Sequence, residues 1–385
     1  MDSPALAARR VDAIERIDAH DWNALAHGGV PFLRHEFLAA LESAGAVGRA
    51  SGWTPAHVTI HDGATLVGAM PLYRKSHSWG EFVFDFAWAQ AYSRYGVPYY
   101  PKLVAATPFT PATGPRLLLR PGVDAARVRR ALLAAALDAS PDASSAHIEF
   151  ATEDEARFLE GEGWLGRIDC QFHWQNRGYS DFDGFLATFT ADKRKKAKRE
   201  RRRVEEAGIS FAMRRGSELS AAEWQRVYAL HAGTFHRHGH EPYLTPGVFA
   251  ALSASAACEP LVLTANFGNE IIATAIFFRG AETLYGRYWG AAAEFHSLHF
   301  EACYHQGIEY CIREGLQHFE PGTQGEHKVA RGFVPRLTHS CHLIRDARFR
   351  EAIGRYLAEE RAAIRAYAND VAAHAPFRAG HLELG

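Results

Sequence analysis

The sequence predicts an α/β fold divided between two domains. The chain has 385 residues, and a domain takes roughly 150. Helical and strand-like patterns alternate in both halves, which favours layers of sheet and helix over a sandwich or a helical bundle. A strand, a glycine-containing turn and a second strand also occur twice, once in each half. We therefore expect each domain to have a mixed central sheet flanked by helices.

The two hairpins are the most regular of these elements. They read HVTIHDGATLVGAMPLYRK from residue 57 and LVLTANFGNEIIATAIFFR from residue 261. Asp62-Gly63 and Gly268-Asn269 supply the turns, because glycine adopts positive φ without steric cost. A further strand, Thr283 to Trp289, follows the second hairpin. The repeated layout predicts an internal duplication.

The remaining elements follow from periodicity, capping residues and helix stops. In the first half we expect helices at Phe32 to Ser43 and Ala125 to Leu137, and strands at His147 to Phe150 and Cys170 to Trp174. In the second half we expect helices at Ala221 to Arg237, Thr245 to Ser253 and Phe300 to Glu314. Strands are expected at His318 to Glu320 and Ser340 to Ile344, before a final helix. The boundary is placed close to residue 176, which gives domains 1–176 and 177–385.

Composition excludes several classes of protein. Hydrophobic residues make up 47% and charged residues 23%, and the net charge is -1, so the chain is a folded protein without an overall attraction to nucleic acid. No apolar stretch reaches the length of a membrane span, and the N-terminus lacks a signal-peptide core, so we expect a cytoplasmic protein. The five cysteines are widely spaced without a CxxC pair, which argues against disulfides and zinc. We assign no metal and no permanently bound cofactor.

The run KRKKAKRERRR, Lys193 to Arg203, has nine basic residues in eleven. A solvated helix face is one interpretation, but these cations repel one another. A phosphate-rich ligand such as RNA, a nucleotide sugar or a coenzyme would offset that repulsion. A nuclear or membrane targeting signal is a third interpretation. We favour binding of a polyanion by these side chains: Lys193, Lys195, Lys196 and Arg199.

Two segments between Tyr285 and Phe333 carry the strongest site signals. Arg287 to Ala292, RYWGAA, has the form R-x-x-G-x-A after a strand and before a helix. In acyl-CoA-dependent acetyltransferases that pattern holds a pyrophosphate on backbone amides and a helix N-terminus. Downstream, EPGTQGEHK from Glu320 to Lys328 gathers two carboxylates, an imidazole and an ammonium in a glycine-rich loop. Such density is typical of a functional site.

The chain resembles the FemAB-like family, the peptidoglycan biosynthesis or recognition group of the GNAT acyltransferase superfamily. The resemblance covers most of the chain. It rests on these ordered blocks: SGWTPAH, PLYRKSHSWGEFVFDFAWAQAY, YYPKLVAATPFTPATGPRLL, KRKKAKRERRRVEEAGI, LYGRYWGAAAEFHSLHFEACYHQGIEYCIREGL and FEPGTQGEHKVARGF. It implies two GNAT-like domains in tandem, in agreement with the duplicated hairpin.

The resemblance also implies chemistry. An N-acyltransferase of this kind moves an acyl or aminoacyl group to an amine by direct attack, and backbone amides polarise the carbonyl where the central strands splay apart. Fem ligases use aminoacyl-tRNA and ordinary GNAT enzymes use acyl-CoA, and the sequence leaves both donors open. The basic run favours a large phosphate ligand. The absence of an inserted coiled-coil arm argues against tRNA binding in the Fem manner.

Roles for individual residues follow from the same resemblance. We expect Glu326 to be the general base, Tyr285 or Tyr288 the acid, and Glu301 a second candidate for the base. The remaining candidates bind substrate or cofactor: Arg287, Lys328, His327, Gly290 and Gln324.

A non-catalytic interpretation stays open. The first domain has no equivalent of R-x-x-G-x-A, so the chain is alternatively a binding module for a cell-wall fragment, a nucleotide sugar or RNA, with the ligand in the cleft between the halves. The aromatic stretch from Trp79 to Tyr100 suits a sugar or peptide surface and suits a core equally well.

Overall fold

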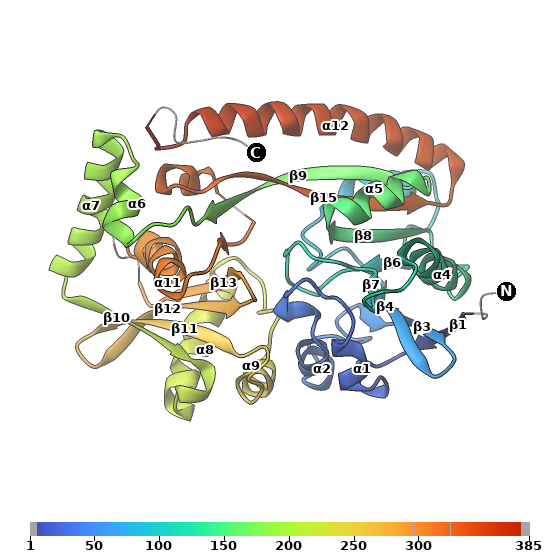
Figure 1. The fold of residues 1–385 in the computed structure, drawn as a ribbon, viewed down its shortest axis with the longest axis horizontal. Coiled ribbons are helices and arrows are strands. Elements are labelled where there is room, and N and C mark those ends of the chain that lie inside the picture. Colours follow the sequence, from blue (N-terminus) through green and yellow to red (C-terminus); the bar gives the residue numbers. More distant parts are fainter. Residues whose placement is uncertain (1–5, 294, 296, 324, 379–385) are drawn as a thin grey trace. The chain divides into compact units, whose positions relative to one another are not determined.

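The computed structural model describes residues 6–293, 295, 297–323 and 325–378. By its internal contacts the chain forms two compact units (Figure 1). Unit 1 consists of the residues up to Asp169 together with Leu337–Arg365, and unit 2 consists of Cys170–Arg336 and the residues from Ala366 on. No helix in the described part of the chain combines the length and the apolarity that a membrane crossing requires.

Unit 1 is built on antiparallel hairpins and a short parallel pair. Its strands are β1 (Ala7–Val11), β2 (Trp53–Pro55), β3 (His57–Asp62), β4 (Thr65–Met70), β5 (Leu72–Lys75), β6 (Lys102–Ala105), β7 (Leu118–Leu119) and β8 (Ser145–Ala151). Its helices include α1 (Ala19–Asn23), α2 (His35–Ser43), α3 (Phe86–Arg94), α4 (Ala125–Asp138) and α5 (Glu153–Gly161). Three longer elements run past the unit boundaries: β9 (Leu165–Gln175), β15 (Val334–Ile344) and α12 (Ala347–Ala373).

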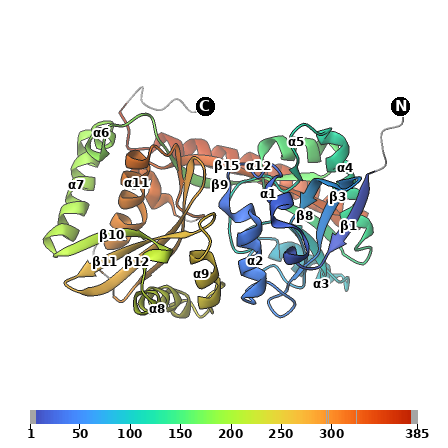
Figure 2. The ribbon, with the colours of Figure 1, turned by 60° about the horizontal axis from the view of Figure 1, so that its bottom comes forward.

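Unit 2 has a central sheet with helices on both faces. Its strands are β10 (Ile209–Arg215), β11 (Pro260–Phe267), β12 (Glu270–Arg279), β13 (Thr283–Ala291) and β14 (His318–Glu320). Its helices include α6 (Phe182–Ala187), α7 (Ala191–Glu206), α8 (Ala221–Arg237), α9 (Pro246–Ser253), α10 (Leu298–Phe300), a π-helical turn (Glu301–His305), α11 (Gln306–Glu314) and the 3₁₀ helix η5 (Glu326–Arg331). Figure 2 shows α7 and α11 on one face of this sheet and α8 and α9 on the other.

Strand pairing around the parallel pair follows the same order in the two units. In unit 1, β3 pairs with β4 and β2 with β5, β5 is antiparallel to β6, β6 is parallel to β8, and β8 is antiparallel to β15. In unit 2, β11, β12 and β13 are antiparallel, β13 is parallel to β14, and β14 is antiparallel to β9. A helical connection joins the parallel strands in both. The predicted hairpins occupy corresponding positions along the chain, but β3 and β4 lie in a separate four-stranded sheet with β1 and β7, whereas β11 and β12 share the sheet of β13 and β14. The α/β class with a mixed sheet is confirmed.

The division of the chain differs from the single boundary expected near residue 176. Strand β15 pairs with β8 of unit 1. The first part of α12 then places Phe349, Ile353 and Leu357 against Trp88 and Tyr92 of the same unit. These apolar side chains recur every four residues, so they share one helix face. That face is buried in the core of unit 1, so residues 337–365 belong to unit 1.

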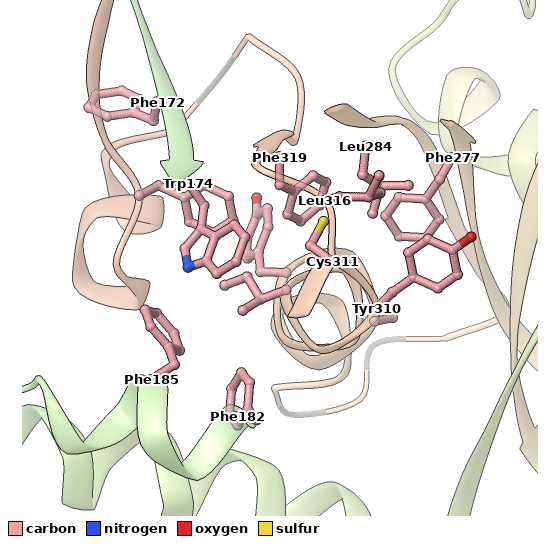
Figure 3. Packing of buried hydrophobic residues seen from close by; sticks show 14 of the residues in the cluster. Phe172, Trp174, Phe182, Phe185, Phe277, Leu284, Tyr310, Cys311, Leu316 and Phe319 are labelled. Carbon is pink, nitrogen blue, oxygen red and sulfur yellow. The ribbon is translucent and has the colours of Figure 1, made fainter. Parts of the chain in front are cut away.

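Aromatic packing fixes the part of unit 2 that carries the predicted loop. Trp174, Phe185 and Phe319 are buried in one cluster with the inner face of α11 (Figure 3). Gly315 ends α11 with φ +70°, a conformation that favours glycine. The chain can therefore turn directly into β14. The predicted helix from Phe300 to Glu314 is present, but its first turns are α10 and the π-helical turn.

Candidate functional site in unit 2

The parallel strands β13 and β14 separate after a short ladder. Their pairing runs from Thr283 with His318 to Tyr285 with Glu320. On the other side of β13, Tyr288 pairs with Ile276 and Gly286 with Phe277, so Arg287 is the extra residue of a β-bulge. A bulge re-aims a side chain, and ligands of open α/β sheets collect where neighbouring strand ends diverge. This point is the candidate site.

Arg287 is held at the divergence. Its Nη1 donates hydrogen bonds to the carbonyl oxygens of Gly286 at 2.9 Å and Glu320 at 3.3 Å. The Glu320 carboxylate lies 3.7 Å from Nη2, and the guanidinium lies 5.1 Å from the centroid of the Tyr285 ring. The Arg287 side chain is 3% exposed. Burial lowers the pKa of Arg287, yet an arginine stays protonated at neutral pH.

Lys328 adds a second buried cation. Its Nζ donates to the carbonyl oxygen of Gly322 at 2.6 Å, and no described carboxylate lies within ion-pair distance of it. Burial, and then the charge of Arg287, lower the pKa of Lys328 to about 7. Burial and the same two cations lower the pKa of His173 on β9 to about 3, so this imidazole is neutral. Because Glu320 offsets Arg287 and Lys328 is partly protonated near neutral pH, the divergence carries a modest positive charge that favours an anionic or developing oxyanionic group.

The exposed side of η5 carries the other predicted residues. Glu326 is exposed and accepts a hydrogen bond from the Tyr367 hydroxyl at 2.8 Å. His327 is also exposed, and its Nε2 lies 2.8 Å from the Tyr304 hydroxyl. Tyr304 projects from the π-helical turn, and such turns are frequent at functional sites. Gln324 lies outside the described residues.

Glu301 has both carboxylate oxygens occupied. Oε2 lies 2.8 Å from His305 Nδ1, while Oε1 accepts from Gln306 Nε2 at 2.8 Å and lies 3.1 Å from Arg201 Nε. Burial opposes ionisation of Glu301, but the His305 hydrogen bond and the positive charges beside it leave its pKa below the ordinary value. A carboxylate with these partners is suited to holding α7 and the π-helical turn together, and Glu326 is the more accessible proton acceptor.

The basic run forms α7 and is tied to the site loop. Ala197, Glu200 and Val204 make up its buried face. Arg331 of η5 donates from Nη2 to both oxygens of Glu200, at 3.1 and 3.0 Å, and from Nη1 to the backbone oxygen of His327 at 2.7 Å. The four side chains expected to bind phosphate are on the exposed side of the helix: Lys193, Lys195, Lys196 and Arg199.

Two predicted site residues of β13, Tyr288 and Gly290, lie on the face of the strand that packs against α8. Tyr288 packs against His231, at 4.8 Å between ring centroids, and against Phe249 at 6.0 Å. Gly290 pairs with Thr274 inside the strand, and a Cβ there would come within 2.2 Å of the Leu230 carbonyl group. The close approach of α8 therefore accounts for this glycine without a phosphate.

A pocket of about 600 Å³ opens beyond the end of β13. It is lined by Arg237, Trp289, Ala291, Ala292, Ala293, Phe295, Leu298 and His299. Arg237 Nη1 donates to the Ala291 carbonyl oxygen at 3.4 Å. The R-x-x-G-x-A segment thus borders a pocket through its last residues, not through Gly290.

The sequence analysis selected a loop and a strand that lie together in the structure, but it did not select the groups that hold them. Arg331, Glu200, Tyr304 and His173 were not among the candidates. Glu200 carried a usable signal, because it is the one acid inside the run from Lys193 to Arg203. Acids within such a run need a partner on the packed side of the helix.

Solved structures with related folds were found at low sequence identity, and no curated protein matches the sequence. FemX is 11% identical, with 90% of this chain and 100% of that chain covered and a TM-score of 0.55. L-PGS from Bacillus licheniformis is 11% identical, with coverages of 86% and 95% and a TM-score of 0.51. A conserved protein of unknown function from Bacteroides thetaiotaomicron is 12% identical, with coverages of 88% and 100% and a TM-score of 0.50. These likenesses establish the fold.

The family assignment rests on nearly the whole chain. The family model for FemAB-like proteins, described as peptidoglycan biosynthesis/recognition, matches residues 13–379. The chain belongs to this family.

Proposed function

We propose that unit 2 carries the transfer site, at the divergence of β13 and β14, and that it forms an amide between an activated acyl or aminoacyl group and an amine. The observation that carries this proposal is the pair of buried cations, Arg287 and Lys328, together with the accessible carboxylate of Glu326, which η5 carries two residues before Lys328. Transfer to an amine needs stabilisation of the carbonyl oxygen and a base for the ammonium proton, and these three residues supply both.

The proposed step is direct attack. The amine nitrogen forms a bond to the carbonyl carbon, and the bond from that carbon to the leaving oxygen or sulfur breaks. Glu326 takes the ammonium proton, while the backbone of β13 and the Arg287 charge stabilise the oxyanion. Tyr285 lies on the Arg287 side of β13 and Tyr288 faces α8, so we assign protonation of the leaving group to Tyr285.

We propose an aminoacyl-tRNA as the donor, bound through α7 and not through an inserted coiled-coil arm. An exposed row of cations on α7 suits an extended polyanion better than a compact one, because each phosphate of a nucleic acid presents its own charge. The pocket beyond β13 favours acyl-CoA as the second candidate, since Arg237 and the end of β13 border it. The family description supports a peptidoglycan precursor as the amine acceptor, and we place the reaction in the cytoplasm, where both donors are made.

Labelled donors separate these possibilities. The purified protein is incubated with a mixed aminoacyl-tRNA pool or with acetyl-CoA, each with an amine-bearing peptidoglycan precursor, and amide formation is followed by mass spectrometry. We expect product from aminoacyl-tRNA. Product from acetyl-CoA alone would assign the second donor, and precursor binding without product from either would favour the non-catalytic binding module.

A further inference from the structure

Unit 1 repeats the strand arrangement that creates the site in unit 2. Its parallel pair, β6 and β8, is hydrogen-bonded from Leu103 with Ala146 to Ala105 with Ile148. The strands then part, as β13 and β14 do. Glu149 is the next residue of β8, and Thr107 follows the end of β6. By the same argument about diverging strand ends, unit 1 has its own position for a ligand.

One face of the unit 1 sheet carries a buried group of charges. Lys102 on β6 contacts Glu81 at 2.6 Å and also contacts Asp85, and its Nζ donates to Ser78 Oγ at 3.0 Å. Lys75, the cross-strand partner of Lys102, lies 3.7 Å from Glu81. These four ionisable side chains are essentially inaccessible to solvent. Buried charges persist when they are paired, and these are.

Glu149 is the exception. It is 1% exposed, and among the described residues no donor reaches its Oε2. Thr107 Oγ1, also buried, lacks a described partner as well. His147 is the cross-strand partner of Val104, so Glu149, two residues further along β8, lies on the same face of the sheet as Lys102. Burial, and then Glu81, raise the pKa of Glu149 well above its ordinary value.

The segment from Trp79 to Phe86 has the reverse of the usual burial pattern. Between Trp79 and Phe86 the acids Glu81 and Asp85 are buried, while Trp79, Phe84 and Phe86 are exposed by 53%, 60% and 40%. The residues after the buried acids on both sides of the group, Phe82 and Phe150, have φ of 63° and 50°. A bulky residue rarely adopts such angles. The backbone thus accepts strain that turns carboxylates inward.

We propose that unit 1 contains a second ligand site, around Glu149, Glu81 and Asp85, that binds the ammonium group of an amine. No described cation forms an ion pair with Glu149, and its Oε2 has no described donor. An ammonium group supplies such a donor, and its positive charge stabilises the ionised carboxylate. The nearby Trp53 ring already accepts a cation, since Lys75 Nζ lies 3.8 Å from its centroid.

The site is tested with ¹⁵N-methylammonium as the probe. Methylammonium is titrated against the intact protein, and ¹⁵N–¹H spectra are searched for a protected, saturable bound signal. Glu149→Gln should weaken binding by about tenfold or more, because the substitution removes a charge-assisted hydrogen bond. The matched control is Glu155→Gln, since Glu155 is equally buried but accepts from the backbone amides of Arg116 and Leu117.

Each outcome decides the proposal. A saturable signal in the wild type and in Glu155→Gln that disappears in Glu149→Gln supports it. No bound signal in the wild type, or equal affinity in Glu149→Gln, overturns it; in the former case a proton on Glu149 balances the charge. If Glu149→Gln does not fold, as judged by circular dichroism, Glu81→Gln takes its place with the same expectation. The readout is binding in unit 1, so a failure of the transfer reaction in unit 2 leaves this test unaffected.

Discussion

Arg331 and Glu200 form a buried, doubly hydrogen-bonded ion pair that joins η5 to α7. The same guanidinium lies 3.4 Å from the centroid of the Phe300 ring and donates to the backbone of His327. One side chain therefore sets the relative position of the basic helix, the helix after β13 and the loop that carries Glu326 and Lys328.

Arg331→Met tests this ion pair. The substitution leaves the Glu200 carboxylate buried without its partner, and we expect the free energy of unfolding to fall by about 3 kcal/mol. Urea denaturation measures the loss. Arg355→Met, which removes an exposed pair with Glu351, is the control and should change stability by less than about 1 kcal/mol. Equal effects of the two substitutions would mean that the buried pair has no special structural role.

Replacing Lys195 and Lys196 with Ala tests the exposed face of α7. Both side chains are exposed, so the melting temperature should stay nearly unchanged while donor affinity falls. The plot of log affinity against log salt should become shallower by about 0.7 for each phosphate that the variant no longer neutralises. Alanine at Arg49 and Arg94, two exposed cations of unit 1, removes the same charge elsewhere. If alanine at Arg49 and Arg94 lowers donor affinity by the same amount, the net charge of the protein and not α7 accounts for the loss.

Gly290→Ala tests the packing role of this glycine. The added Cβ meets backbone atoms of α8, which have little freedom to move, so we expect a loss of at least about 2 kcal/mol in the free energy of unfolding. Gly233→Ala on α8 is the matched control, because its nearest neighbour is the end of the Arg237 side chain at 3.6 Å. That substitution should stabilise the helix by up to about 1 kcal/mol. A stable Gly290→Ala protein would refute the packing explanation.

The buried Lys328 gives stability a specific pH dependence. Its pKa is about 7 in the folded protein and 10.5 ordinarily, so the unfolded chain binds more protons between these values. Stability therefore increases as pH rises through this window, by at most about 1.4 kcal/mol per pH unit. Lys75 in unit 1, whose pKa burial also lowers to about 7, adds a dependence of the same sign.

Lys328→Met isolates the contribution of Lys328. Urea denaturation of the wild type and the variant at about pH 6 and about pH 9 gives two differences. The variant should gain most relative to the wild type at the lower pH, where the folded wild type holds a buried ammonium group. A difference that does not change with pH would show that Lys328 is solvated in the folded protein.

Local features of the fold were predictable, and contacts between distant segments were not. The α8 bounds, Ala221–Arg237, and both hairpins agree with the sequence prediction, because capping residues and turn glycines act within a few positions. The place of residues 337–365 in unit 1 depends on packing against Trp88 and Tyr92, about which local patterns carry no information.

The candidate site was likewise only partly predictable from the sequence. The density of charged residues in the loop from Glu320 to Lys328 was visible in the sequence, and so was the strand that carries Arg287. The partner of Arg331 was not, because Glu200 lies far away in the chain and no local pattern pairs them. Gly290 fitted a phosphate-binding motif by sequence, whereas its neighbours in space are backbone atoms of Leu230.

The rate of amide formation in Glu326→Gln, at saturating donor, tests the proposed transfer site most directly. We expect a fall of about 10² or more relative to the wild type, the usual contribution of a positioned base, with an unchanged melting temperature. Glu241→Gln, which alters an exposed carboxylate of the same unit, should keep the wild-type rate. A wild-type rate in Glu326→Gln would contradict the assignment of the proton acceptor to η5.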